Sequence, residues 1–147
     1  MFADLRVPVE RTNVEVLTTD GKRHELVVFH PPGVGIDSFI EAQEPFFPAH
    51  EGDAFLMFSR ANVMALSVPA PADASEADEA LPKTRRNVRV HLLGNMVMTG
   101  EIRYVAWEGA SRPVDYLNEP SLSFALFRDG RVFHVSKRHV SYVEEQR

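Results

Sequence analysis

Apolar and polar residues alternate along two stretches of the chain that lie far apart in the sequence. Val14 and Val16 flank a polar residue in the first stretch, and Val88 and Val90 do so in the second. A period of two residues is typical of a β-strand that buries one face. The pattern therefore predicts a strand at the start of each stretch.

A turn and a second strand follow each of these predicted strands. Thr19-Asp20-Gly21-Lys22 contains an Asp-Gly pair, which favours the positive φ angles of a tight hairpin. Leu93-Gly94-Asn95 occupies the corresponding place in the second stretch. Apolar segments at 25–29 and 97–105 then predict the return strands. Each stretch is thus expected to begin with a β-hairpin.

The pattern changes in the middle of each stretch. Apolar residues at 36, 39 and 40 have the spacing of one helix face, which predicts one or two helical turns over Ile36–Ala42. Pro113–Asn118 is predicted to do the same, because proline is tolerated at the first position of a helix. Further short apolar segments predict the closing strands, at 54–58, 62–68, 123–127, 132–135 and 140–143.

This order of elements predicts a mainly β protein, with an α+β arrangement as the alternative. Two small SH3-like or Sm-like barrels, each with one short helical turn and packed as a pseudo-dimer, would remove exposed strand edges. An open sheet would leave those edges exposed. The pattern does not decide whether the two units close as barrels or share one sheet.

The two stretches resemble each other, which indicates two diverged copies of one unit. A unit of about 55–60 residues buries too little surface to be stable alone, so the copies are expected to share a core or to pack on each other. Four short matches keep their order along the chain: Asn13–Val16 with Asn87–Val90, His24–Phe29 with Gly100–Val105, Asp37–Phe39 with Asp115–Leu117, and Ser59–Val63 with Ser136–Val140.

The matches divide the chain into five parts. The linker between the copies is rich in Ala, Pro and acidic residues, a composition typical of a solvated, flexible connection. Ser75 can cap a short helix over 75–81 within it. The predicted parts are an N-terminal arm at 1–12, a first repeat at 13–68, the linker at 69–86, a second repeat at 87–143 and a tail at 144–147.

Composition excludes several kinds of site. The 147 residues contain no cysteine, which rules out a disulfide framework, a zinc–thiolate site and a cysteine nucleophile. The N-terminus lacks a charged start followed by an apolar run, and no stretch approaches the ~18 apolar residues of a membrane span. We therefore expect a soluble, cytoplasmic protein with no membrane partner.

Charge is unevenly distributed along the chain. Residues 1–82 hold 5 Lys/Arg and 14 Asp/Glu, whereas residues 83–147 hold 11 Lys/Arg and 7 Asp/Glu. The first part is therefore acidic and the second basic, and the whole chain has a net charge of −5. The acidic and basic parts either attract each other or offer a charge-selective docking face.

Apolar, glycine and polar residues of the second repeat form a family-like pattern: Val88, Val90, Leu92, Gly94, Gly100, Asp115, Asn118 and the segment 135–143. In these residues the repeat resembles the Sm-like family of RNA-binding barrels, which implies RNA binding. It departs from the family in the Asp115-to-Asn118 spacing, one residue short, and in Lys137-Arg138 where the family has Arg-Gly. Most of the chain is also similar to small uncharacterised bacterial repeat proteins, a similarity that implies no known function.

No group of polar residues predicts a catalytic centre, a metal site or a cofactor site. The six histidines lack the spacing of a His-Glu-x-x-His helix or a zinc finger. His134 and His139 flank a predicted turn and would need a third ligand such as Asp115. Gly33-Val34-Gly35 lacks the Lys-Ser/Thr of a phosphate-binding loop. An acid/base pair assembled by the fold stays open.

Basic and aromatic residues make up most of the predicted partner-binding set. Neighbouring strand residues point to opposite faces, so one of Phe46 and Phe47 is expected at the surface unless a loop tucks both inward. Arg112, Lys137 and Arg138 are expected to dock an acidic partner surface. The full set is Phe46, Phe47, Arg112, Asp115, Asn118, Lys137, Arg138 and His139.

These features predict a non-enzymatic adaptor or scaffold that binds another protein within a bacterial regulatory complex. Sm-like RNA binding is the first alternative: interleaved basic and aromatic residues favour it, whereas the sequence pI of about 5.7 disfavours it. A small-molecule or enzyme site assembled only in the fold is the second alternative. The oligomeric state is not predicted.

Overall fold

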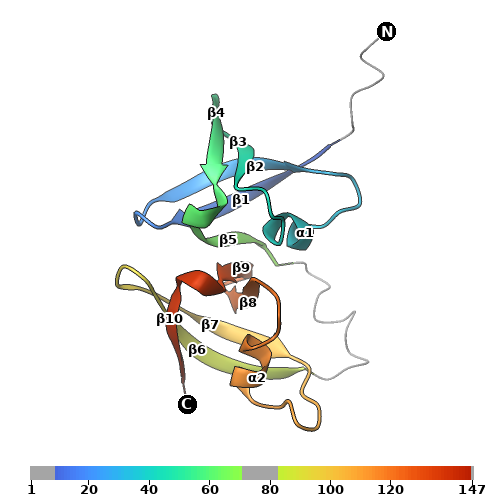
Figure 1. Ribbon diagram of the computed structural model, residues 1–147, viewed down its shortest axis with the longest axis vertical. Helices are drawn as coiled ribbons and strands as arrows, with labels where there is room; N and C mark the ends of the chain where they lie inside the picture. The colour runs from blue at the N-terminus through green and yellow to red at the C-terminus, as the bar shows by residue number, and fades with distance from the viewer. Residues whose placement is uncertain (1–8, 71–82, 147) are drawn as a thin grey trace.

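Ten antiparallel β-strands form one sheet in the computed structural model, which describes residues 9–70 and 83–146 (Figure 1). The strand order across the sheet is β10-β6-β7-β8-β9-β5-β1-β2-β3-β4. The strands are β1 (Glu10–Thr18), β2 (Arg23–His30), β3 (Phe46–Glu51), β4 (Ala54–Ser59), β5 (Val63–Pro69), β6 (Thr84–Leu92), β7 (Met96–Tyr104), β8 (Ser123–Arg128), β9 (Arg131–Ser136) and β10 (Val140–Glu145).

Short helical segments interrupt the strands at four places. They are the helices α1 (Ile36–Ile40) and α2 (Pro113–Leu117) and the 3-10 turns η2 (Arg60–Asn62) and η3 (Lys137–His139). The two helices lie on the same side of the molecule in Figure 1. Within the described part of the chain, no helix has the length and apolar character needed to cross a membrane.

The N-terminal half (10–69) and the C-terminal half (84–145) contain the same order of elements. The loop between β7 and α2 is three residues longer than the loop between β2 and α1. When the halves are aligned by the end of the second strand and the start of the helix, His24 corresponds to Met98 and Asp37 to Val114. The sequence matches of His24 with Gly100 and of Asp37 with Asp115 therefore lie slightly out of the structural register.

The prediction of a mainly β protein is confirmed, as are both opening hairpins and both helical segments. Gly21 has φ +81° in the first turn, where the Thr18 and Lys22 backbones also hydrogen-bond. The first strand of each half begins three residues before its predicted repeat, at Glu10 and Thr84. The short helix predicted over 75–81 lies outside the described residues.

One strand, β3, was not predicted. Its sequence has adjacent phenylalanines and a proline, which hide the alternation of a strand. In β3 only Ala49 and His50 pair with β2. Pro48 lies outside this short segment and is therefore tolerated. As expected for strand neighbours, Phe46 is 61% exposed whereas Phe47 is 2% exposed.

The described strands form no closed barrel, so the predicted pair of barrels is replaced by one open sheet. The physical reason is the pairing of β5, which completes the N-terminal half on one side and joins β9 of the other half on its second side. The junction pairs Ala65 with Val135 and Val68 with Val132. β4 and β10 are left at the two ends of the sheet.

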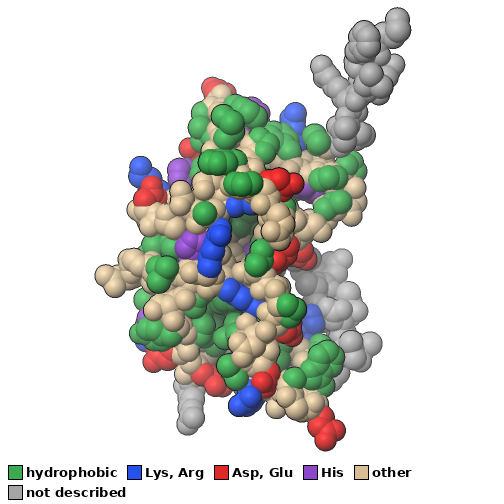
Figure 2. Space-filling view, viewed as in Figure 1, with side chains coloured by type: hydrophobic (Ala, Val, Ile, Leu, Met, Phe, Trp, Pro, Cys, Tyr) green, Lys and Arg blue, Asp and Glu red, His purple; other side chains and the backbone are tan. Residues whose placement is uncertain are grey.

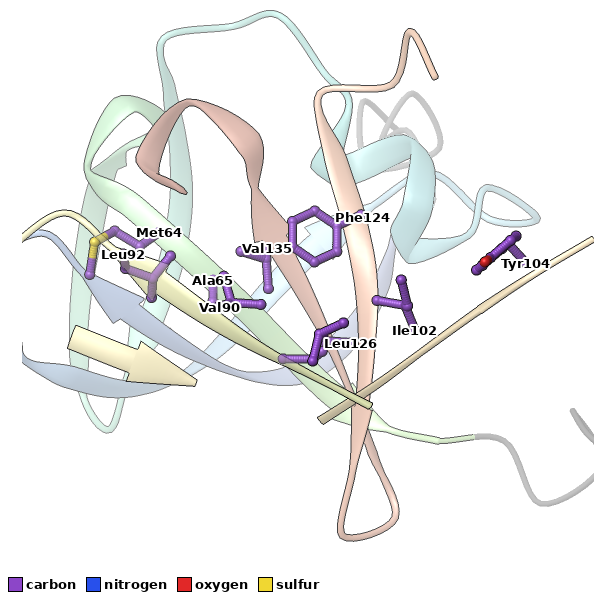
Figure 3. Packing of buried hydrophobic residues seen from close by; sticks show 10 residues of the cluster. Met64, Ala65, Val90, Leu92, Ile102, Tyr104, Phe124, Leu126 and Val135 are labelled. Atoms are coloured by element: carbon purple, nitrogen blue, oxygen red, sulfur yellow. The ribbon is translucent and has the colours of Figure 1, made fainter. Parts of the chain in front are cut away.

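Two hydrophobic clusters hold the sheet together, one in each half. The predicted inward residues Val14, Val16, Val88 and Val90 are all buried. The cluster of the C-terminal half also contains Met64 and Ala65, which β5 contributes from the N-terminal half. Figure 3 shows these two side chains among residues of β6, β8 and β9. The halves therefore share a core, as expected of units too small to be stable alone.

Candidate ligand-binding cleft between the two halves

A cleft of about 600 Å³ lies where the two halves meet. The N-terminal half supplies α1, the start of β3 and η2, and the C-terminal half supplies the segment before β8 and η3. Phe39, Phe47 and Leu66 give it an apolar lining. Figure 2 shows Lys and Arg side chains gathered in the middle of this face of the molecule. The volume falls within the usual range of ligand pockets.

Arg60 is the most constrained cation of this cleft. Its side chain is 16% exposed, and its guanidinium lies over the rings of Phe39 and Phe47, at 4.8 and 5.1 Å from their centroids. Nη1 donates to the Phe39 carbonyl oxygen at 2.7 Å, whereas Nε is buried and has no hydrogen-bond partner. Burial lowers the pKa of Arg60, and Glu44 at 3.9 Å opposes this shift. An arginine stays protonated nonetheless, so the cleft holds a poorly compensated positive charge.

Two further cations line the same cleft from η3. Lys137 Nζ donates to the Glu119 carbonyl oxygen at 2.7 Å, and Arg138 is exposed. Glu44 is the one carboxylate among the described lining residues, and its side chain is largely in solvent. The cleft therefore combines an apolar lining with cations from both halves, of which Arg60 is largely buried and Arg138 is exposed.

Hydrogen bonds between the halves fix the shape of the cleft. The Glu41 carboxylate accepts from the Leu122 backbone N–H at 2.9 Å and from the Ser123 hydroxyl at 3.0 Å. His139 Nε2 donates to the Ala61 carbonyl oxygen at 2.7 Å, because a carbonyl can only accept. These bonds position η2, α1 and η3 against one another before any ligand binds.

Two histidines of the junction have lowered pKa values. Burial lowers the pKa of His134, against the opposing effect of Asp37 and Glu41. Burial also lowers the pKa of His139; its bond to the Ala61 carbonyl opposes this shift and the Arg138 charge adds to it. With the proton of neutral His139 on Nε2, Nδ1 is buried without a partner, and a second proton there would have no acceptor.

Stability is accordingly expected to fall in mild acid. Both imidazoles have folded-state pKa values below the ordinary 6.5, so the unfolded chain binds more protons as the pH drops through 6.5. The contribution of the two neutral histidines to the free energy of unfolding is therefore complete above pH 6.5 and is lost below it. The free energy of unfolding then falls by up to about 1.4 kcal/mol per pH unit for each histidine. Urea unfolding of the wild type and of His139→Gln between about pH 8 and pH 5 checks this. An identical slope in both proteins would contradict the role of His139.

The structure separates the predicted partner-binding residues. Lys137, Arg138 and Phe47 line the cleft. His139 is buried behind it, and Phe46 lies on the outer surface. Arg112, Asp115 and Asn118 belong to α2 and its ends and do not line the cleft.

Arg112 has a partner within its own helix. Its Nη2 donates to Asp115 Oδ1 at 3.0 Å and its Nε to Oδ2 at 3.1 Å. The hydrogen bond from Arg112 lowers the pKa of the Asp115 carboxyl. Asp115 therefore caps α2 and forms no metal-binding group with His134 and His139. No cluster of three or more His, Cys, Asp or Glu that could hold a metal ion occurs in the described ranges.

No protein-family model, curated protein or solved structure matches the chain. Sequence reasoning noted Arg60 only as part of a repeat match and did not place it in a site. The available signal was its correspondence with Lys137, which occupies the same place in the Ser-Arg/Lys turn before the last strand of the other half.

Proposed function

We propose that this chain is a non-enzymatic adaptor, built from two diverged copies of one small SH3-like or Sm-like β unit, whose cleft binds an acidic segment of a partner protein. The observation that carries the proposal is Arg60, a largely buried guanidinium whose Nε has no partner and whose ion pair with Glu44, at 3.9 Å, is formed by a carboxylate that is largely in solvent. Such a charge costs stability unless an anion compensates it.

The lining favours a carboxylate beside an apolar side chain. Arg60, Lys137 and Arg138 supply positive charge, and Phe39, Phe47 and Leu66 supply an apolar surface. The Phe39 and Phe47 rings already contact the Arg60 guanidinium and each other, so they are not free to stack on nucleic-acid bases. This arrangement favours an acidic, partly apolar peptide over RNA.

The proposal predicts charge-dependent peptide binding. A fluorescent peptide of alternating glutamate and leucine is expected to bind the wild type, and a matched glutamine–leucine peptide is not. Lys137→Glu combined with Arg138→Glu is expected to weaken binding about tenfold or more, since like charges then oppose the peptide. Fluorescence anisotropy at low and at physiological ionic strength measures the effect.

Arg112→Glu is the matched control, because it makes the same kind of charge change outside the cleft. Its peptide affinity is expected to stay within about twofold of the wild type. Equal binding of the glutamine peptide, or equal loss in the Arg112 variant, would refute the proposal. Tighter binding of a labelled single-stranded RNA would favour the Sm-like alternative instead. A pull-down with the wild type and the η3 double variant would then identify the natural partner.

A further inference from the structure

The strand β4 is the last strand at one end of the sheet that the described residues form. Among the described strands it pairs with β3 alone, and its segment Ala54–Phe58 contains no charged residue. Phe55 is 56% exposed and Met57 is 71% exposed, next to the exposed Phe46 of β3. Figure 2 shows hydrophobic side chains gathered at the top of the molecule, where Figure 1 places β3 and β4. An apolar edge of this kind is a template for pairing with another chain.

The strand β10 at the other end of the sheet is different. Glu144 and Glu145 occupy its last two positions. Each pairs with an arginine of β6, at 3.6 Å to Arg89 and 3.5 Å to Arg86. Charged side chains on an edge strand discourage pairing with another chain.

The strands β10 and β4 correspond to β5 and β9, which form the junction between the halves. A second copy could therefore set its β10 against β4 in the same way, but the side chains of these two strands do not match. The internal junction pairs Ser67 with Phe133 and Val68 with Val132. Transferred to the corresponding positions of the other half, the same register would set Glu144 opposite Leu56 and Glu145 opposite Phe55. Two carboxylates would then lose solvent and their arginine partners against apolar side chains, which is unfavourable.

We propose that two copies of the chain pair through their β4 strands, antiparallel and about a two-fold axis. This dimer uses a surface apart from the cleft and does not depend on what the cleft binds. Residues directly opposite each other in an antiparallel pair point to the same face of the sheet, whereas neighbours along a strand point to opposite faces. The two-fold axis must therefore lie at a residue that faces its own copy. An axis at Leu56 sets Phe55 against Met57 of the second copy and leaves only apolar residues in the pair.

The pairing provides partners for both the backbone and the exposed apolar side chains of β4. The unpaired backbone groups of β4 gain hydrogen bonds, as in other cases of strand addition. The exposed Phe55 and Met57 side chains gain cross-strand neighbours, including a favourable sulfur–aromatic contact in each half of the pair. Two-fold pairing of one identical surface is also the commonest form of self-association.

Sedimentation velocity of the full chain tests the proposal. The wild type is expected to reach twice the 16.6 kDa mass of the chain with rising concentration. Phe55→Lys and Phe55→Glu are both expected to remain monomeric, because each sets a charged side chain opposite Met57 of the second copy and places the two like charges diagonally across the axis. Val97→Lys, at a residue 49% exposed on β7, is the matched control and is expected to dimerise. Phe55 and Val97 are both exposed, so thermal unfolding of the three variants should show intact folds.

The two charges at position 55 distinguish the two modes of pairing. If Phe55→Lys still associates while Phe55→Glu does not, Glu145 of β10 faces β4 and the two-fold proposal is wrong. A wild type that stays monomeric at every concentration also overturns it.

Cross-linking locates the axis, since the chain has no cysteine of its own. Leu56→Cys is expected to form a disulfide-linked dimer on oxidation, because paired residues on the axis lie within disulfide range. Val97→Cys is expected to stay monomeric under the same conditions. A chain that cross-links only when both Leu56→Cys and Glu144→Cys are present would show pairing of β4 with β10 and overturn the proposal.

Discussion

Gly100→Ala is expected to lower the free energy of unfolding by about 3 kcal/mol, at the upper end of the range for overpacking. Gly100 lies in β7, where β8 approaches closely. A Cβ atom there would lie 2.8 Å from Leu126 Cγ and 2.8 Å from the Phe127 carbonyl oxygen. The leucine can change rotamer, but the carbonyl belongs to the backbone of β8. The added methyl group must therefore push the two strands apart.

Gly35→Ala is the matched control for this substitution. Gly35 precedes α1 with φ −72°, and an added Cβ atom would meet nothing within 4 Å. Alanine there is expected to be neutral or to stabilise by about 0.4–1 kcal/mol, because it restricts the unfolded chain. Chemical denaturation of the three proteins measures both effects. Equal stability of the Gly100 variant and the wild type would show that β7 and β8 do not approach as described.

Arg60→Met is expected to separate binding from stability. Methionine keeps an unbranched apolar side chain beside Phe39 and Phe47, but it is shorter than arginine and removes the guanidinium with its buried charge. The loss of the bond to the Phe39 carbonyl is offset by the relief of desolvation, so the free energy of unfolding should stay within about 1 kcal/mol of the wild type. Peptide binding should weaken by about 30-fold or more, because a carboxylate loses its buried partner.

Arg131→Met is the matched control at the same junction. Arg131 donates three hydrogen bonds to Ser67 of the other half, to its hydroxyl oxygen at 3.0 and 3.1 Å and to its carbonyl oxygen at 3.2 Å. Its loss should lower stability by about 1–3 kcal/mol and leave peptide affinity unchanged. If Arg60→Met instead lowered the free energy of unfolding and left the peptide affinity unchanged, Arg60 would have a structural role.

Much of the fold could be predicted because it depends on local patterns. The alternation of Val14 with Val16 and of Val88 with Val90 predicts the first strands, and glycine in the turns predicts the hairpins. β3 escaped prediction because Phe46-Phe47-Pro48 hides the period of a strand. Its pairing with β4 along its whole length, rather than its own sequence, makes it a strand.

The candidate site was less accessible to sequence reasoning. Lys137 and Arg138 were predicted to act together with Arg112, but α2 holds Arg112 against Asp115 and away from them. Arg60 belongs to the other half of the chain and joins Lys137 in the cleft only because the halves pack together. The spacing of residues within one segment does not show which distant segment that segment will contact.

The sequence by itself determined the described strands other than β3, the turns and the two helical segments. Propensity, capping and the period of apolar residues all act over a few positions, so a single chain reveals them. Only the tertiary structure decided that β5 joins β9, that the sheet stays open with β4 and β10 at its ends, and that Arg60 is buried beside the η3 cations. These features depend on which of several similar strand edges pair, and edge pairing is set by contacts between residues far apart in the sequence.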